Sequence, residues 1–263
     1  MKALVTHLET KDITSGRAKG RKLSAGSIRN ALAPLRALLA TAVEEGLLRA
    51  NPMAGMRIAG RRVDPTDRRV LTENELAALI AASPAGGKRI LLRLLSETGL
   101  RIGEAVGLRW EHVALETQRI AVRERIYRET TDAPKSGYGR RDIPMGRELT
   151  RVLREHKLAS RFSKDGDYVF TTKTGSAHRP ENLRRGVLHK ACDSAKVERV
   201  GFHAFRHTAI TRWFLGGVDA KRVQVMAGHH SVAFTLSTYT HVLPSDLPST
   251  DAMDALAIGR SRA

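Results

Sequence analysis

Apolar residues recur three and four positions apart along much of this chain, and that spacing predicts a largely helical protein. Between residues 28 and 43 it predicts an amphipathic helix that stops near Gly46, with Pro34 as a kink or as the start of a new helix. Thr72 and Glu75 stand at the spacing of a capping box, which predicts another helix start. Further helices are predicted over residues 90–98, 102–110, 183–195, 203–215, 220–226, 231–239 and 252–258.

A few stretches alternate between apolar and polar residues, as half-buried strands do. Residues 120–126 place apolar side chains on one face, and residues 141–144 can pair back across the loop of residues 136–139. This pattern predicts a β-hairpin, and residues 167–170 are a further strand candidate. So few strands among so many helices indicate a fold that is mainly α with a small β-sheet, in the α+β class.

The chain divides into two predicted domains. Asn51 and Pro52 end the first helical unit, and residues 60–69 have the polar, proline-containing composition of an interdomain linker. A length of 263 residues is enough for two domains that each bury a core. The predicted parts are a first domain (1–60), a linker (61–70), a second domain (71–245) and a tail (246–263).

Charge narrows the choice of partner. Lysine and arginine number 45 against 27 aspartates and glutamates, and the formal net charge of +18 favours a polyanion, nucleic acid ahead of an anionic membrane. The longest apolar run, residues 76–82, is far too short for a transmembrane helix. The N-terminus shows no secretion signal, so a cytoplasmic protein is expected. Cys192 is the one cysteine, which forbids an intrachain disulfide and a multi-cysteine zinc site.

Cationic and imidazole side chains gather near predicted glycine turns, without matching acidic clusters, which suits phosphate chemistry. Arg101 follows Gly99, and Glu104, three residues later, lies on the same face of the next helix. The carboxylate could hold the guanidinium in place, or the two could form an ordinary surface ion pair. Tyr239, considered alone, fits a structural role.

Histidines add a second set of candidates. His203 and Arg206 stand three apart on one predicted helix, and His207 could be a buried histidine bonded to the backbone. Zinc ligation by His203 and His207 is poorly supported, because no glutamate follows His203 and no cysteine is suitably spaced. His229 stands at a predicted helix N-terminus, where backbone N–H groups favour an anion.

Five short motifs occur in one order along the chain: TGLRIGE at 98–104, PKS at 134–136, HAFRHT at 203–208, GH at 228–229 and TYTH at 238–241. In order and approximate spacing they resemble the tyrosine recombinase, or phage integrase, family. The resemblance covers roughly residues 70–245 as the family's catalytic domain. Residues 1–60 resemble the later part of its helical core-binding domain.

The resemblance implies a role for each matching residue. Arg101 and Arg206 would hold the non-bridging oxygens of a scissile DNA phosphate, and Tyr239 would attack the phosphorus to form a 3′-phosphotyrosyl intermediate. Lys135 would protonate the departing 5′ oxygen as a general acid. The remaining implied roles are acid/base chemistry for His203, a phosphate contact for His229 and the orientation of catalytic side chains for Glu104.

The function implied by the resemblance is site-specific recombination of double-stranded DNA, in the sense of integration or excision. Four protomers on two DNA sites are implied, with neither metal, ATP nor any other cofactor. Two alternatives stay open: a catalytically silent DNA-binding relic on the same fold, and a metal-dependent nuclease that uses His203, His207 and carboxylates.

Two features depart from the family pattern. The run at residues 226–229 reads MAGH where the family often has Leu-Gly-His, which predicts local repacking only. Residues 1–60 supply only the later helices of a core-binding domain that usually has about four. Either the chain begins inside a longer reading frame, or it is a minimal form that encircles DNA less fully. Residues 246–263 are expected to pack onto an adjacent protomer.

Overall fold

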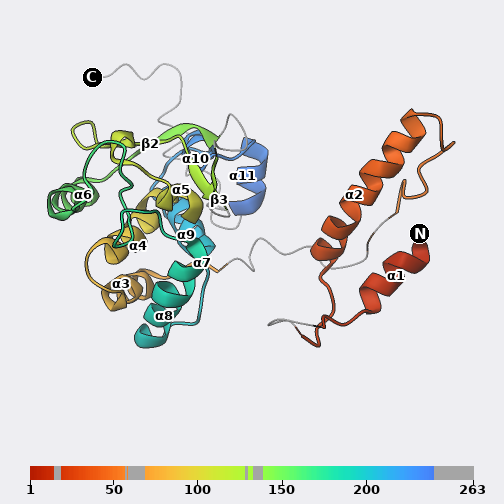
Figure 1. The fold of residues 1–263 in the computed structure, drawn as a ribbon, viewed down its shortest axis with the longest axis horizontal. Helices are drawn as coiled ribbons and strands as arrows, with labels where there is room; N and C mark the ends of the chain where they lie inside the picture. The colour runs from red at the N-terminus through yellow and green to blue at the C-terminus, as the bar shows by residue number, and fades with distance from the viewer. Residues whose placement is uncertain (15–18, 57, 59–68, 128–129, 133–138, 240–263) are drawn as a thin grey trace, which may run out of the picture. The chain divides into compact units, whose positions relative to one another are not determined.

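The computed structural model describes residues 1–14, 19–56, 58, 69–127, 130–132 and 139–239. The chain divides into two units, Met1–Asp67 and Arg68–Ala263 (Figure 1). The first unit contains α1 (Lys2–Thr10) and α2 (Ala25–Glu44). The second unit contains α3 (Glu73–Ala82), α4 (Gly87–Thr98), α5 (Ile102–Val106), η2 (Trp110–His112), β1 (Val113–Ala114), β2 (Arg119–Val122), β3 (Arg125–Tyr127), β4 (Thr130–Asp132), β5 (Arg141–Pro144), α6 (Arg147–Ala159), α7 (Pro180–Leu183), η4 (Arg184–Leu188), α8 (His189–Ala195), α9 (Phe202–Leu215), α10 (Ala220–Ala227) and α11 (Val232–Tyr239).

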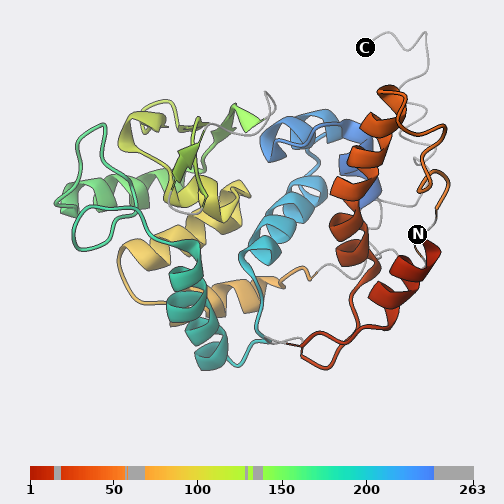
Figure 2. The ribbon, with the colours of Figure 1, turned by 45° about the vertical axis from the view of Figure 1, so that its right-hand side comes forward.

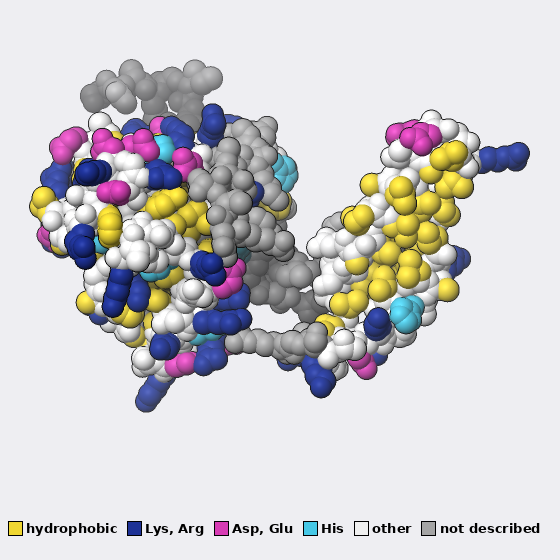
Figure 3. Space-filling view, viewed as in Figure 1, with side chains coloured by type: hydrophobic (Ala, Val, Ile, Leu, Met, Phe, Trp, Pro, Cys, Tyr) yellow, Lys and Arg dark blue, Asp and Glu magenta, His cyan; other side chains and the backbone are white. Residues whose placement is uncertain are grey.

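The first unit is built on the long helix α2. Pro34 lies inside this single helix, so the expectation that it could start a new one is wrong. A proline removes one backbone hydrogen bond, and the buried side chains of Ile28 and Leu32 hold the preceding turns in place. Other apolar side chains of the unit, such as Leu38, remain exposed, and Figure 3 shows hydrophobic groups gathered along its surface.

Local sequence signals set the first helices of the second unit. Thr72 and Glu75 form the expected capping box, with Glu75 N–H donating to Thr72 Oγ1 at 3.2 Å. α4 ends at Gly99, whose φ of 59° is the left-handed conformation that favours glycine. α5 is shorter than the predicted helix over residues 102–110, because it ends at Gly107 and the chain then enters the 3₁₀ turn η2.

The predicted hairpin is confirmed in part: residues 119–122 pair with residues 141–144, but residues 125–127, expected in the same strand, pair with residues 130–132 instead. β2 pairs with both β1 and β5 in an antiparallel sheet, and Ile120 stands opposite Ile143. β3 and β4 form a separate two-stranded ribbon. The predicted strand over residues 167–170 is wrong: Tyr168 makes one isolated bridge with Arg109, because the partner segment turns into η2 at the next residue. The fold is mainly helical with a small sheet, which confirms the predicted class.

The helix α9 runs through the second unit. It packs on α4 along one side and on α10 along another, and Figure 2 shows α10 and α11 near its C-terminal end. Its buried residues face in several directions, as the central helix of a core requires. Residues 203–215, 220–226 and 231–239 form the expected helices, whereas Lys135 and the predicted helix over 252–258 lie outside the described residues. None of the described helices has the length and apolar character needed to cross a bilayer.

The close approach of Gly103 to the backbone of β3 gives a test of the fold. A Cβ added to Gly103 would lie 2.7 Å from the backbone oxygen of Ile126, so α5 and β3 would have to separate. We expect Gly103→Ala to lower the free energy of unfolding by about 1–3 kcal/mol in urea denaturation. Gly186→Ala is the matched control, because a Cβ there meets no atom within 4 Å. A Gly103 variant as stable as the control would contradict the packing.

Candidate active site

Arg101 begins the cluster at the turn between α4 and α5. Its backbone N–H donates to Glu104 Oε2 at 2.9 Å, and its Nη1 donates to Glu104 Oε1 at 2.9 Å. The side chain of Glu104 is only 4% exposed while that of Arg101 is 40% exposed. The alternative of an ordinary surface ion pair is therefore wrong, because the carboxylate is buried and the guanidinium reaches the surface above it.

Arg141, on β5, is the second partner of the buried carboxylate. Its Nη2 donates to Glu104 Oε2 at 2.8 Å and its Nη1 to Glu104 Oε1 at 3.1 Å, a bidentate arrangement. Sequence reasoning assigned Arg141 only to a strand. Its position in the strand could have revealed this role. Arg141 lies two residues before Ile143, on the same buried face of the hairpin, where a charged side chain needs a buried partner.

The charge state of Glu104 follows from these contacts. Burial alone would raise the pKa of this carboxyl. The hydrogen bonds and positive charge of Arg141, together with Arg101, outweigh burial and lower the pKa from its usual value near 4.5 to about 2. Glu104 is therefore a carboxylate at neutral pH and holds both guanidiniums in fixed positions.

Arg206, on α9, is buried at 4% exposure beside this group. Its Nη1 donates to the carbonyl oxygen of Gly99 at 2.7 Å, and its Nη2 donates to the carbonyl oxygen of Ala227. Burial and the positive charge of Arg101 lower the pKa of Arg206 to about 9, so the guanidinium stays protonated at neutral pH. It joins the glycine turn after α4 to the end of α10.

Three arginines meet at the C-terminal end of α10, where helix carbonyls lack partners within the helix. Arg141 Nε donates to Met226 O at 2.7 Å, Arg206 to Ala227 O, and Arg101 Nη2 to Gly228 O at 3.3 Å. The negative end of a helix favours cations, which offsets part of the repulsion between the guanidiniums. Three consecutive carbonyls thus position three arginines, which come from the turn before α5, from β5 and from α9.

His229 follows that end of α10 and is 7% exposed. Burial and the charges of Arg206, Arg101 and Arg141 lower the pKa of His229 to about 3, so the ring is neutral. Its Nδ1 lies 2.9 Å from Thr235 Oγ1, whose proton is donated to Ser231 O at 3.1 Å. Nδ1 therefore donates to the hydroxyl, and Nε2 is left as an acceptor.

Tyr239 lies at the end of α11 and is 2% exposed. Its ring centroid is 6.5 Å from that of His229, with the planes 14° apart, and 5.9 Å from that of Phe214. Its hydroxyl oxygen is 2.8 Å from Nδ1 of His207. Sequence reasoning considered for His207 a backbone hydrogen bond or a metal, and the phenol contact could not be seen from spacing alone.

His203 occupies the first turn of α9, on the exposed side of the cluster. Partial loss of hydration and the positive charges of Arg206 and Arg101 lower its pKa. Its ring centroid is 6.3 Å from that of His207. Within the described part of the chain, no three His, Cys, Asp or Glu residues are grouped so that they could hold a metal ion.

The structure thus brings most of the expected residues into one cluster, with Lys135 outside the described residues. Hydrogen bonds connect Arg101 and Arg206 to the α10 end and Glu104 to Arg101, and His203, His229 and Tyr239 lie around them. The arrangement offers fixed positive charges, one buried carboxylate and a phenol in contact with an imidazole. Such a group of donors suits an oxyanion, above all a phosphate.

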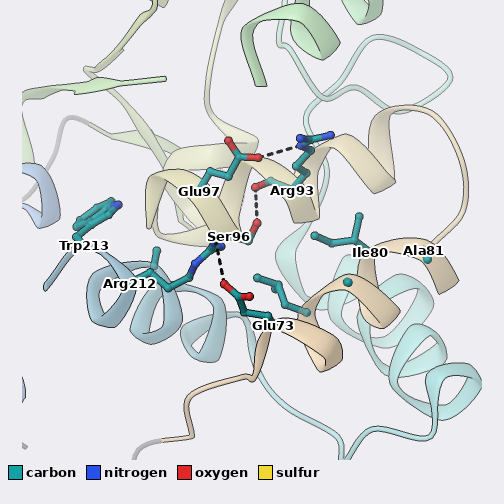
Figure 4. Close-up of a pocket in the computed structure, with 11 residues that line it drawn as sticks. Glu73, Ile80, Ala81, Arg93, Ser96, Glu97, Arg212 and Trp213 are labelled. Carbon is teal, nitrogen blue, oxygen red and sulfur yellow. Dashed lines mark hydrogen bonds and ion pairs between the residues drawn. The ribbon is translucent and has the colours of Figure 1, made fainter. Parts of the chain in front are cut away.

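A separate hollow of about 760 Å³ lies between α3, α4 and α9 (Figure 4). Arg93 donates to Glu97 at 2.9 Å along one wall, and Arg212 pairs with Glu73 at 3.7 Å along another. Trp213 lines the hollow and also contacts the Gly99 turn, where an added Cβ would lie 3.0 Å from the indole. The residues of the arginine cluster do not line this hollow.

Similarity to known proteins covers most of the chain. The model of the phage integrase family matches residues 69–246. Among curated proteins, the chain is 29% identical to a tyrosine recombinase XerC-like protein of Caldanaerobacter subterraneus, over 82% of this chain and 61% of the relative. It is 27% identical to the transposase from transposon Tn916 of Enterococcus faecalis, over 82% of this chain and 58% of the relative. The chain thus spans about three fifths of the length of these two relatives.

Solved structures share the fold. The Tn1549 transposon integrase in complex with circular intermediate DNA has a TM-score of 0.68 and 24% identity, over 89% of this chain and 81% of that chain. A lambda integrase tetramer bound to a Holliday junction has a TM-score of 0.59 and 20% identity, over 79% of this chain and 59% of that chain.

The buried carboxylate gives a test of the cluster. Glu104→Gln would leave the Arg141 guanidinium buried without its counter-charge, so we expect a loss of about 3–5 kcal/mol in the free energy of unfolding, measured in urea at neutral pH. Because the folded-state pKa of Glu104 is lowered to about 2, this stability is present above pH 4.5 and is lost as the pH falls toward 2. The difference in free energy of unfolding between the wild type and Glu104→Gln should therefore become smaller as the pH falls from 4.5 toward 2.

Glu148→Gln is the matched control for that measurement. Glu148 pairs with Arg151 on the exposed surface of α6, where water screens the ion pair and its contribution to stability is small. Equal losses for the two variants, or a Glu104 difference that stays constant down to pH 2, would contradict a buried, charged Glu104.

Proposed function

The chain belongs to the phage integrase family, and we propose that it is a site-specific recombinase that cleaves and rejoins double-stranded DNA through a 3′-phosphotyrosyl intermediate. The observation that carries the proposal is the position of Tyr239. Its ring lies 6.5 Å from that of His229, which directly follows the α10 end that Arg101 and Arg206 contact. A nucleophile beside fixed cations is what attack on a negatively charged phosphodiester requires.

Arg101 and Arg206 are proposed to bind the non-bridging oxygens of the scissile phosphate. A phosphodiester repels nucleophiles through its own negative charge, and positioned guanidiniums offset that charge as it grows in the transition state. Both groups are already held by backbone carbonyls, and Arg101 also by Glu104, so little reorganisation is needed when DNA arrives. Arg141 shares the Glu104 carboxylate with Arg101 and so helps to hold that carboxylate in place.

The proposed reaction exchanges one phosphoester for another. The Tyr239 oxygen forms a bond with phosphorus while the bond to the 5′ oxygen breaks, and Lys135 gives that oxygen a proton. A 5′ hydroxyl of a partner strand later attacks the phosphotyrosine and releases the tyrosine. Because each step replaces one phosphoester bond with another, the bond energy is retained and the reaction requires no ATP.

The proposed partner is DNA, in an assembly of several protomers. The net charge of +18 supplies the electrostatic attraction to phosphates, and both solved neighbours described above were bound to DNA. We propose a homotetramer on two DNA sites, by analogy with the lambda integrase tetramer on a Holliday junction. Integration or excision of a mobile element is the favoured reaction, in keeping with the transposon enzymes among the similar proteins.

Covalent capture tests the proposal. The protein is incubated with a pool of nicked duplexes of randomised sequence and then denatured in detergent, and the DNA that remains attached is recovered. We expect attachment by the wild type and none by Tyr239→Phe, because phenylalanine lacks the attacking oxygen. Tyr168→Phe, a change at a tyrosine that contacts Arg109, is the matched control and should retain capture.

Two outcomes would contradict the proposal. Equal capture by Tyr239→Phe would exclude this nucleophile. Gel-shift binding of DNA by the wild type with no covalent product on any duplex would favour a DNA-binding protein that does not exchange strands.

Lys135 gives a second test. Lys135→Ala should slow formation of the covalent product by about 10²–10⁴-fold, the usual contribution of a general acid. A substrate with sulfur at the 5′ bridging position should restore the rate, because a thiolate leaves without needing a proton. Lys173→Ala, at an exposed lysine, serves as the control. If sulfur speeds the wild type and the Lys135 variant equally, Lys135 is not the acid.

A further inference from the structure

The phenol of Tyr239 is stored in contact with an imidazole that the implied catalytic set leaves out. The hydroxyl oxygen lies 2.8 Å from Nδ1 of His207, a hydrogen-bond distance, and the ring centroids are 5.9 Å apart. Tyr239 is 2% exposed, so bulk water has little access to this hydroxyl. The structure therefore places His207 where a proton leaving the phenol would arrive.

Proton transfer from the phenol requires an acceptor nitrogen on the imidazole. A neutral imidazole carries one proton and one acceptor nitrogen. Nδ1 of His207 is the atom within reach of the phenol, and a neutral ring with its proton on Nε2 presents Nδ1 as the acceptor.

The two other histidines of the cluster are placed differently. His229 uses its Nδ1 on Thr235, and its ring centroid lies 6.5 Å from that of Tyr239 with the planes 14° apart. His203 lies one helical turn before His207, with ring centroids 6.3 Å apart. The imidazole nitrogen at hydrogen-bond distance from the phenol oxygen therefore belongs to His207, although the family resemblance implies acid/base chemistry for His203.

We propose that His207 is the general base that takes the proton of Tyr239 during DNA cleavage, an inference that rests on the proposed recombinase function. In the forward step the phenol proton moves to Nδ1 of His207 as the oxygen bonds to phosphorus and the bond to the 5′ oxygen breaks. In the return step a 5′ hydroxyl attacks the phosphotyrosine, and the departing phenolate takes the proton back from the imidazolium. Protons and electron pairs balance in both directions, and no further reactant is needed.

The first test measures the covalent step in a single turnover on a captured duplex. His207→Ala should slow formation of the covalent product by about 10²–10⁴-fold, the range for loss of general base catalysis. His112→Ala is the matched control, because His112 is similarly half-buried but lies in η2. A His207→Ala rate equal to that of the control would overturn the proposal.

A second variant separates proton transfer from packing. Replacing Tyr239 with 3-fluorotyrosine makes the phenol more acidic while it remains nearly the same size. In the His207→Ala background, where water must take the proton, the fluorine should accelerate the covalent step several-fold. With His207 present the same fluorine should change the rate much less. Equal effects in both backgrounds would show that His207 only packs against the ring.

A third measurement is independent of DNA cleavage, so it separates this inference from the proposed function. Nitrogen NMR of the DNA-free protein, with His207 assigned by comparison with His207→Ala, reports which ring nitrogen carries the proton. The proposal requires a neutral ring at neutral pH, with the proton on Nε2 and a bare Nδ1. An imidazolium, or a proton on Nδ1, would overturn it. Absence of Tyr239-dependent capture by the wild type would instead overturn the recombinase function.

Discussion

Three guanidiniums held at one helix end are the arrangement on which the rest of the site depends. Arg101, Arg141 and Arg206 would repel one another in an apolar interior, since like charges disfavour their charged forms. Three successive carbonyls, at residues 226–228, each accept a hydrogen bond from a different one of these arginines. Among the described residues, Glu104 is the carboxylate that Arg101 and Arg141 share. These acceptors make the clustering of positive charge stable without DNA.

This arrangement also explains how distant parts of the chain reach one point. Arg141 connects the hairpin to α5 through Glu104, and Arg206 connects the turn after α4 to the end of α10. α10 packs on α11, which ends at Tyr239. The position of the phenol is therefore coupled, through packed helices, to the position of the guanidiniums. A site held in this way loses little free energy to reorganisation when a substrate is bound.

Much of the local structure could be predicted from the sequence because its causes are local. The capping box at Thr72, the left-handed turn at Gly99 and the pairing of residues 120–122 with 141–143 each depend on a few neighbouring side chains or on alternation. The expectation that Pro34 could start a new helix was wrong, because the packing of α2 outweighs the loss of one backbone hydrogen bond. The strand expected at residues 167–170 failed because its partner segment bends away after one bridge, which no pattern within the strand can show.

Some residues of the candidate site could be predicted from the sequence, and others could not. Motif spacing named Arg101, Arg206 and Tyr239, and the structure places them around one helix end. Motif spacing did not give roles to Arg141 or His207, because the partner of each is distant in the sequence. His207 contacts Tyr239, 32 positions away, and Arg141 contacts Glu104, 37 positions away. For Arg141, the local sign in the sequence was a charged residue at an apolar position of a strand. For His207, no local sign distinguished it from a structural histidine.

The charge balance of the cluster indicates what DNA would change. Around Glu104 the protein places more guanidiniums than carboxylates, and these charges, with burial, keep His229 neutral with a pKa of about 3. A phosphate bound there would supply negative charge and raise the pKa of His229, since an opposite charge favours the protonated ring. Only with that second proton could Nε2 donate to a phosphate oxygen, because Nδ1 is already committed to Thr235. The anion would thus complete a site that the protein alone leaves positively charged.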